Sequence, residues 1–180
     1  MATTARYWIL AEDVAGARMI EQWLKSRSVD MREIKTIIAP KGQGSGKQWV
    51  TANVADHLRA FRAKKASHLI KGFIAMTDAD ELSVQQRRQQ LEDALVTRRV
   101  APRPPNAPEA FIIPKWEHET WARHINHQTQ ELEAGPVRWE RQRALDEAVA
   151  AGGRLHTHRQ DAPGCCPPSL QAADAELRRI

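Results

Sequence analysis

Two aspartates, Asp78 and Asp80, directly follow a short apolar run at residues 72–76 and are separated by a single alanine. Two carboxylates this close repel each other, and a hard divalent cation relieves the repulsion. Mg²⁺ is the natural candidate, because it binds carboxylate oxygens and keeps several of its waters. The alternative is that an aspartate caps a helix beginning near Glu81, although one aspartate suffices for a cap.

The residues before the two aspartates predict a buried strand. Residues 72–76 (Gly-Phe-Ile-Ala-Met) carry almost no polarity, which is typical of a strand buried on both faces in a parallel sheet. We expect this strand to span residues 69–77. Branched and aromatic residues predict further strands at residues 6–11, 31–39 and 110–113. Helices are expected between the strands, at residues 14–27, 49–64 and 82–97.

The alternation of strands and helices predicts an α/β fold. We expect a Rossmann-like, mostly parallel sheet of about four strands flanked by helices. Two more helices are expected after the sheet, at residues 137–151 and 168–179. The predicted division is an α/β domain at residues 1–134 and a helical C-terminal extension at residues 135–180, packed on the same domain.

Acidic residues follow three of the four expected strands. Glu12 follows the first strand, Asp78 and Asp80 follow the third, and Glu117 and Glu119 follow the fourth. Because the carboxyl ends of parallel strands meet at one edge of the sheet, we expect these five side chains to converge there. Glu117 and Glu119 also lie at the start of an expected helix, where the helix dipole favours carboxylates in any case. Acids at three strand ends indicate a metal site.

A glycine-rich stretch at residues 40–48 precedes the second expected helix. It fails the P-loop pattern, because Lys41 and Gln48 stand where that pattern needs a glycine and a serine or threonine. We interpret it as a basic loop near a phosphate backbone, with Lys41 and Lys47 as point charges. A plain surface loop is an equally good interpretation.

The bulk composition allows a nucleic-acid partner and argues against a disulfide scaffold. The 180 residues carry a formal net charge of +5 and a sequence pI of about 9.6, which suits a polyanion, although a solvated basic face is the simpler explanation. The two cysteines, Cys165 and Cys166, are adjacent, and no Cys-x-x-Cys pair exists to build a zinc site. His156 and His158 fall on an expected loop at residues 152–166, with no partner ligand fixed by spacing.

No targeting or membrane-spanning segment is expected from the sequence. It has no basic and apolar leader and no apolar run of about 18 residues, so we expect a soluble, cytoplasmic protein without membrane contact. An oligomer is compatible with these features.

Three motifs, taken in order, give the chain a resemblance to a known family. They are Trp-Ile-Leu-Ala-Glu at residues 8–12, Asp-Ala-Asp at residues 78–80, and Ile-Pro-Lys-Trp-Glu-His-Glu at residues 113–119. The chain resembles the Toprim-like domains, in particular small bacterial Toprim-like proteins found near defence genes. They are related to the nuclease domains of overcoming-lysogenization-defect proteins. A Cys-Pro-Pro-Ser stretch at residues 166–169 is similar to one before the last helix of these proteins. Asp13 and Glu81 stand where many Toprim proteins have glycine.

The resemblance implies a Mg²⁺- or Mn²⁺-dependent nuclease that cleaves the phosphodiester bonds of nucleic acid. By resemblance, Glu12, Asp78 and Asp80 would be catalytic and bind metal, and Glu119, with Glu117 as substitute, would complete the metal shell. Lys41, Lys47 and Lys115 are the residues expected to hold the phosphate backbone. Topoisomerase or primase activity is not expected, because the other domains of those enzymes do not fit in 180 residues.

The resemblance also implies partners. It suggests a component of an anti-phage defence system, acting with an ATPase or another defence subunit. A different class of function is a non-catalytic interaction subunit of such an ATPase-containing complex, in which the acids are relics or helix caps. Six tryptophans offer contact residues for that role, among them Trp49, Trp116, Trp121 and Trp139.

Overall fold

The structure is a computed structural model that describes residues 5–42, 44–65, 70–128, 135–161 and 166–180. Leu69, where we expected the third strand to begin, lies outside the described residues. So do Cys165, the expected domain boundary at residue 134, and the side chains of His156 and His158.

The centre of the molecule is one four-stranded sheet in which every strand runs parallel to its neighbours. The strand order is β2-β1-β3-β4, and the strands are β1 (Tyr7–Ala11), β2 (Ile34–Ile38), β3 (Gly72–Met76) and β4 (Glu109–Ile112). The register is level: Ala11 pairs with Ile38 on one side and Met76 on the other, and Met76 pairs with Ile112. The predicted α/β class with four parallel strands is confirmed, and the arrangement is consistent with a Rossmann-like fold.

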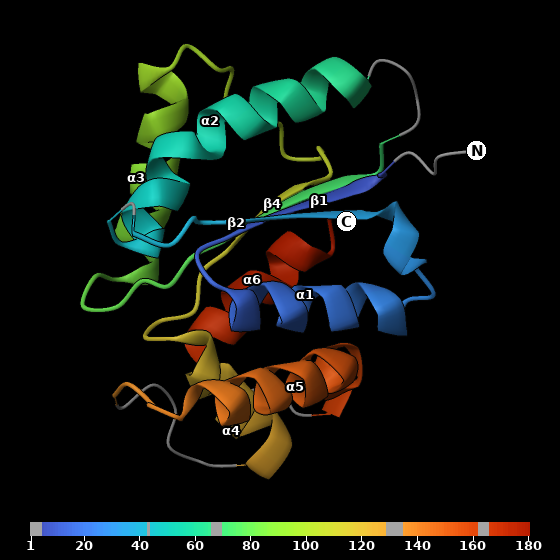
Figure 1. Cartoon of the computed structure of the whole chain (residues 1–180). Helices are drawn as coiled ribbons and strands as arrows, with labels where there is room; N and C mark the ends of the chain where they lie inside the picture. Colours follow the sequence, from blue (N-terminus) through green and yellow to red (C-terminus); the bar gives the residue numbers. More distant parts are fainter. Residues whose placement is uncertain (1–4, 43, 66–69, 129–134, 162–165) are drawn as a thin grey trace.

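Strand alternation sends successive side chains into two separate cores, one on each face of the sheet. In β1, Ile9 faces one core, whereas Trp8 and Leu10 face the other. The first core is covered by α1 (Val14–Ser26), α4 (His118–His127), α5 (Arg141–Asp161) and α6 (Pro168–Leu177). The second is covered by α2 (Gly46–Lys65) and α3 (Val84–Thr97). Figure 1 shows these two layers below and above the sheet.

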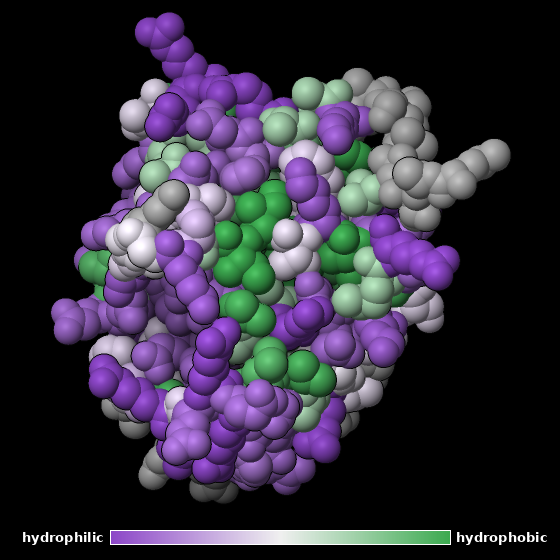
Figure 2. Space-filling model, in the orientation of Figure 1, coloured by the Kyte–Doolittle hydropathy of each residue, from purple (hydrophilic) through white to green (hydrophobic). Residues whose placement is uncertain are grey.

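Most of the viewed face is hydrophilic, but apolar residues gather across its middle, over the edge strand β2 (Figure 2). Strand β2 follows a 3-10 turn at Met31–Glu33, and its residues are only partly buried. The other three strands are fully buried. Among the described helices, none combines the length and the apolar character that crossing a membrane requires.

Helices α5 and α6 belong to the same core as the sheet. Helix α6 is attached to β4 through the buried carboxylate of Glu176, whose Oε2 accepts hydrogen bonds from Arg103 Nη1 at 2.7 Å and from the backbone N–H of Phe111 at 2.9 Å. A second link joins α4 to α6, where Trp121 Nε1 donates to Ser169 Oγ at 2.7 Å. Because these polar groups are buried, each one needs its partner to offset the loss of water.

The expected boundaries of α5 and α2 were wrong. Helix α5 runs from Arg141 to Asp161 instead of residues 137–151, so His156 and His158 lie on a helix and not on the expected loop. Two consecutive glycines, Gly152 and Gly153, follow the expected end, but packing against α1 overrides their weak helix propensity. Helix α2 begins at Gly46 instead of Trp49, so the glycine-rich loop is shorter than predicted.

Helix α5 approaches α1 so closely at Gly152 that the position accepts only glycine. A Cβ atom there would lie 2.2 Å from the backbone oxygen of Met19, whereas a Cβ at Gly153 would meet nothing within 4 Å. We expect Gly152→Ala to lower the free energy of unfolding by about 1–3 kcal/mol, as overpacking does. Gly153→Ala should instead raise it by roughly 0.5–1 kcal/mol, through better helix propensity.

Chemical denaturation of the two variants beside the wild type measures both effects. Gly153→Ala is the matched control, since it makes the same substitution one residue away on the same helix. Equal effects of the two substitutions would contradict the close approach of α1 and α5.

Candidate active site at the carboxyl edge of the sheet

A pocket of about 280 Å³ lies at the carboxyl edge of the sheet. It is lined by residues from four separate segments: Glu12, Asp13, Ser45, Gly46, Lys47, Asp78, Asp80, Glu117 and Glu119. All five acids that the sequence predicted to converge therefore line a single pocket. The level register of the strands brings them together, because the chain leaves β1, β3 and β4 at the same height.

Glu12 and Asp78 form the innermost pair of carboxyl groups. Asp78 is only 6% exposed, and its carboxyl group hydrogen-bonds to that of Glu12. Thr77 Oγ1 donates a second hydrogen bond to Glu12 Oε2 at 3.0 Å. Burial raises the pKa of both carboxyl groups, and the negative charge of Glu12 raises that of Asp78 further. These effects favour the protonated form of Asp78, which donates a hydrogen bond to Glu12.

Asp80 has a strained backbone that its neighbours hold in place. Its φ is 51°, in the left-handed region that non-glycine residues seldom adopt. Its carboxylate pairs with Lys47, and its backbone oxygen accepts a hydrogen bond from Lys115 Nζ at 2.6 Å. Lys115 Nζ also donates to the backbone oxygen of Leu82 at 2.8 Å. The turn after β3 is thus fixed from two sides.

The helix-cap alternative for the two aspartates is wrong. Helix α3 begins at Val84, and its cap is Ser83, whose side chain accepts from the backbone N–H of Gln86 at 3.1 Å. The two aspartates are left at the pocket instead. Asp13 does act as a cap, because its Oδ1 accepts from the backbone N–H of Gly16 at 2.7 Å at the start of α1.

Glu117 and Glu119, which follow β4, line the pocket together with the acids that follow β1 and β3. Burial raises the pKa of Glu119 to about 7 and raises that of Glu117 above its ordinary value. His118, between them, is 3% exposed, and its Nδ1 lies 3.3 Å from Glu119 Oε2 and 3.8 Å from Asp13 Oδ2. Burial lowers the pKa of His118, so the imidazole is neutral and positions Glu119.

Sequence reasoning missed three contributors to this site, namely Thr77, His118 and Gly46. A Cβ atom on Gly46 would lie 2.7 Å from the backbone oxygen of Glu12, so glycine is what lets the first turn of α2 reach the end of β1. This contact aims the positive end of the α2 dipole at the carboxyl groups. The only signals in the sequence were the polar residues beside Asp78 and Glu117 and the glycines before the helix.

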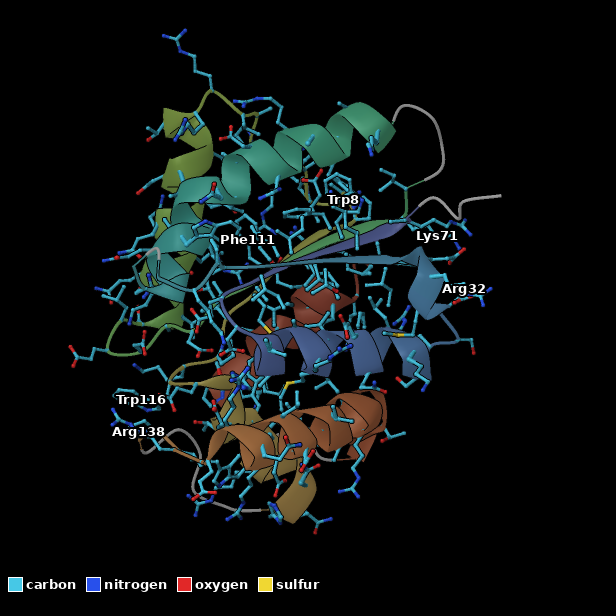
Figure 3. All side chains as sticks on the ribbon, viewed as in Figure 1. Trp8, Arg32, Lys71, Phe111, Trp116 and Arg138 are labelled. Atoms are coloured by element: carbon cyan, nitrogen blue, oxygen red, sulfur yellow. The ribbon has the colours of Figure 1, made fainter. Side chains whose placement is uncertain are left out.

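The three predicted phosphate-binding lysines have different surroundings. Lys47 lines the pocket and pairs with Asp80. Lys115 is bound to the backbone of the turn after β3, and its ammonium also lies 4.1 Å from the centre of the Trp116 ring. Lys41 is exposed and lines a neighbouring groove. Figure 3 shows Trp116 at this edge with Arg138, and Lys71 at the opposite edge.

The donor set of the pocket fits a hard divalent cation. Among the described residues that line it, six are carboxylic acids and only Lys47 is basic. Oxygen donors of this type suit Mg²⁺ or Mn²⁺. Within the described part of the chain, no three His, Cys, Asp or Glu side chains already converge as a metal centre. Binding would therefore require the carboxyl groups to lose protons and turn toward the ion.

No family model, curated protein or solved structure matches this chain. The resemblance to Toprim-like domains consequently depends on the short motifs around Glu12, Asp78 and Glu117. The geometry of the carboxyl edge is the main support for a function.

The raised pKa values predict how stability depends on pH and on metal. In the folded protein Glu119 releases its proton at about pH 7 instead of 4.5, so the folded state holds protons that the unfolded chain has lost. The free energy of unfolding should therefore fall as pH rises through this window when no metal is present. An ion such as Mg²⁺ would bind the deprotonated carboxylates, so a metal site here predicts that Mg²⁺ stabilises the protein more at about pH 8 than at about pH 5.

Thermal unfolding with EDTA and with Mg²⁺ at the two pH values measures this effect. Stabilisation should reach about 2.7 kcal/mol when free Mg²⁺ is about 100 times its Kd. Asp78→Asn is expected to lose most of it while retaining the hydrogen bond to Glu12. Equal stabilisation of the variant and the wild type would contradict a metal site at Asp78.

Proposed function

We propose that this protein is a Mg²⁺- or Mn²⁺-dependent nuclease with a Toprim-like active site. The observation that carries the proposal is the composition of the carboxyl-edge pocket, in which six acids surround one lysine beside the amino end of a helix. A metal balances the excess negative charge, and the helix end and Lys47 supply a positive edge for a phosphate. A phosphodiester is the substrate class that uses both features.

Each side chain of the pocket has a role in this proposal. Glu12, Asp78, Asp80 and Glu119 would hold the metal, with Glu117 as substitute. When bound, the metal supplies an activated water and neutralises charge on the scissile phosphate. Glu12 can also hold or release a proton, since burial raises its pKa above the ordinary value and Thr77 orients its carboxyl group.

The backbone and the lysines position the substrate. The first N–H groups of α2 lie at the pocket, where Gly46 allows their approach, and such groups bind phosphate oxygens well. Lys47 can exchange its pairing with Asp80 for one with a phosphate once a metal has taken Asp80. Lys115 acts through the backbone, because it fixes the turn that carries Asp80.

The cellular setting is a further part of the proposal. The resemblance to small Toprim-like proteins suggests a cytoplasmic component of an anti-phage defence system. An ATPase or another defence subunit is the partner that the resemblance suggests.

Cleavage assays test the nuclease directly. Purified protein is incubated with plasmid, single-stranded DNA and RNA in Mg²⁺, in Mn²⁺ and in EDTA. Cleavage should require metal and fall by about 100-fold or more in Asp78→Ala and in Asp80→Ala, since each removes a metal ligand. Asp56→Ala is the matched control, because Asp56 is an exposed aspartate of α2 that pairs with Arg59 outside the pocket. Full activity of Asp78→Ala would refute the assignment.

A non-catalytic interaction subunit is the second candidate. It is favoured by the hydrogen bond between the Glu12 and Asp78 carboxyl groups, through which the two buried acids satisfy each other. Isothermal titration with Mg²⁺ and Mn²⁺ separates the two functions. A nuclease should bind the ion and lose binding in Asp78→Ala, whereas an interaction subunit should give no specific heat.

A further inference from the structure

A second and larger cavity adjoins the acidic pocket. This groove has a volume of about 1000 Å³ and shares Glu12, Asp13 and Glu119 with the pocket. Its walls are the first turn of α1, the chain after β2, the start of α4 and the first turns of α5. In Figure 1 the starts of α1 and α5 lie on the same side of the molecule, where the strands end. A polymer bound at the pocket can therefore extend into this groove.

The chemistry of the groove changes along its length. The end shared with the pocket is acidic, whereas the remainder is lined by Trp139, Lys41 and Arg141 together with apolar side chains such as Ile38 and Leu145. An aromatic ring combined with cations is the usual platform for an unpaired nucleotide, in which the base stacks and the phosphate is neutralised. A groove of about 1000 Å³ lies at the upper end of the range of ligand pockets, roughly 300 to 1,000 Å³, and has room for more than one nucleotide unit.

Trp139 lines the groove and packs against the first core. The ring is half-buried and packs at the margin of the core between the sheet and α1. The guanidinium carbon of Arg143 lies 5.2 Å from the ring centre, and Arg143 does not line the groove. Arg143 therefore contacts the ring without belonging to the groove lining, whereas Trp139 itself is part of that lining.

Neither cation of the groove pairs with a carboxylate among the described residues. Lys41 and Arg141 are both exposed, and neither makes an ion pair within the described residues. This differs from Lys47, whose charge is matched by Asp80. Cations that no side chain neutralises attract phosphates most strongly, because binding does not have to break an existing pair.

We propose that the groove binds the unpaired nucleotides next to the scissile phosphate, so that the substrate is single-stranded nucleic acid. The base stacks on Trp139, and Lys41 and Arg141 contact the flanking phosphates. A base inside a duplex has both faces covered by its neighbours and cannot reach the ring, which excludes duplex from this groove. The inference rests on the proposed nuclease function, because it takes the acidic pocket as the place of the scissile phosphate.

Binding measured without metal separates this inference from the cleavage reaction. Fluorescent single-stranded DNA, single-stranded RNA and a duplex hairpin of equal length are titrated with protein in EDTA, followed by anisotropy. Single strands should bind more tightly than the hairpin. Trp139→Ala should weaken single-strand binding by about 10- to 100-fold, as loss of one stacked base does.

Trp49→Ala is the matched tryptophan control. Trp49 is also half-buried at the margin of a core, but on the other face of the sheet and away from the groove. Its removal should leave binding within about twofold, on the scale of an energetically neutral residue. Equal weakening by the two substitutions, or equal affinity for hairpin and single strand, would overturn the inference.

A second variant tests the groove without touching the core. Lys41→Ser with Arg141→Ser changes exposed residues only, so the fold should be retained. The slope of log K against log salt should become shallower by about 1.4, which is two phosphate contacts at roughly 0.7 each for a single strand. An unchanged slope would overturn the phosphate contacts.

The outcomes for the groove and for the nuclease are distinguishable. Binding that depends on Trp139 without any metal-dependent cleavage would keep the groove and reject the nuclease. Cleavage that depends on Asp78 but binding that is insensitive to Trp139 would keep the nuclease and reject the groove.

Discussion

The burial of Asp78 against Glu12 is the interaction on which the carboxyl edge depends. Two acids in contact, one of them nearly inaccessible to water, destabilise the fold whenever both are charged, and the protein meets this cost by keeping a proton between them. A divalent ion bound here, as we propose, would have to take the place of that proton.

The surrounding elements are arranged to make that burial tolerable. The amino end of α2 reaches the end of β1 because Gly46 has no side chain, and Lys47 in the same turn neutralises Asp80. The segment after β3 is held next to the segment after β4 by a hydrogen bond from the backbone N–H of Ala79 to the oxygen of Pro114, at 2.8 Å. Lys115 also holds the turn after β3, because it donates to the backbone oxygen of Asp80. These contacts hold Asp80 in a left-handed backbone conformation that a non-glycine residue seldom adopts.

Much of the fold could be predicted from the sequence, because hydrophobic period and strand length are local signals. The apolar run at residues 72–76 and the acids at three strand ends were enough to predict a parallel sheet and the convergence of five side chains. The features that sequence reasoning did not predict are determined by tertiary contacts. The end of α5 depends on its packing against α1, which no local pattern around Gly152 reveals. The contact between Gly46 and Glu12 and the place of His118 likewise arise only when separate segments meet, and so does the use of Lys115 to hold backbone oxygens.

The position of α5 has a consequence for the synthesis of the chain. The strands and acids of the pocket have all been made by about Glu119, but the helices that complete their core and one wall of the groove come from residues after Arg138. Domains generally fold as units during synthesis, so on a ribosome the acids take their final places only when α5 and α6 have emerged and docked. The pocket and the groove are therefore completed together, late in the synthesis of the chain.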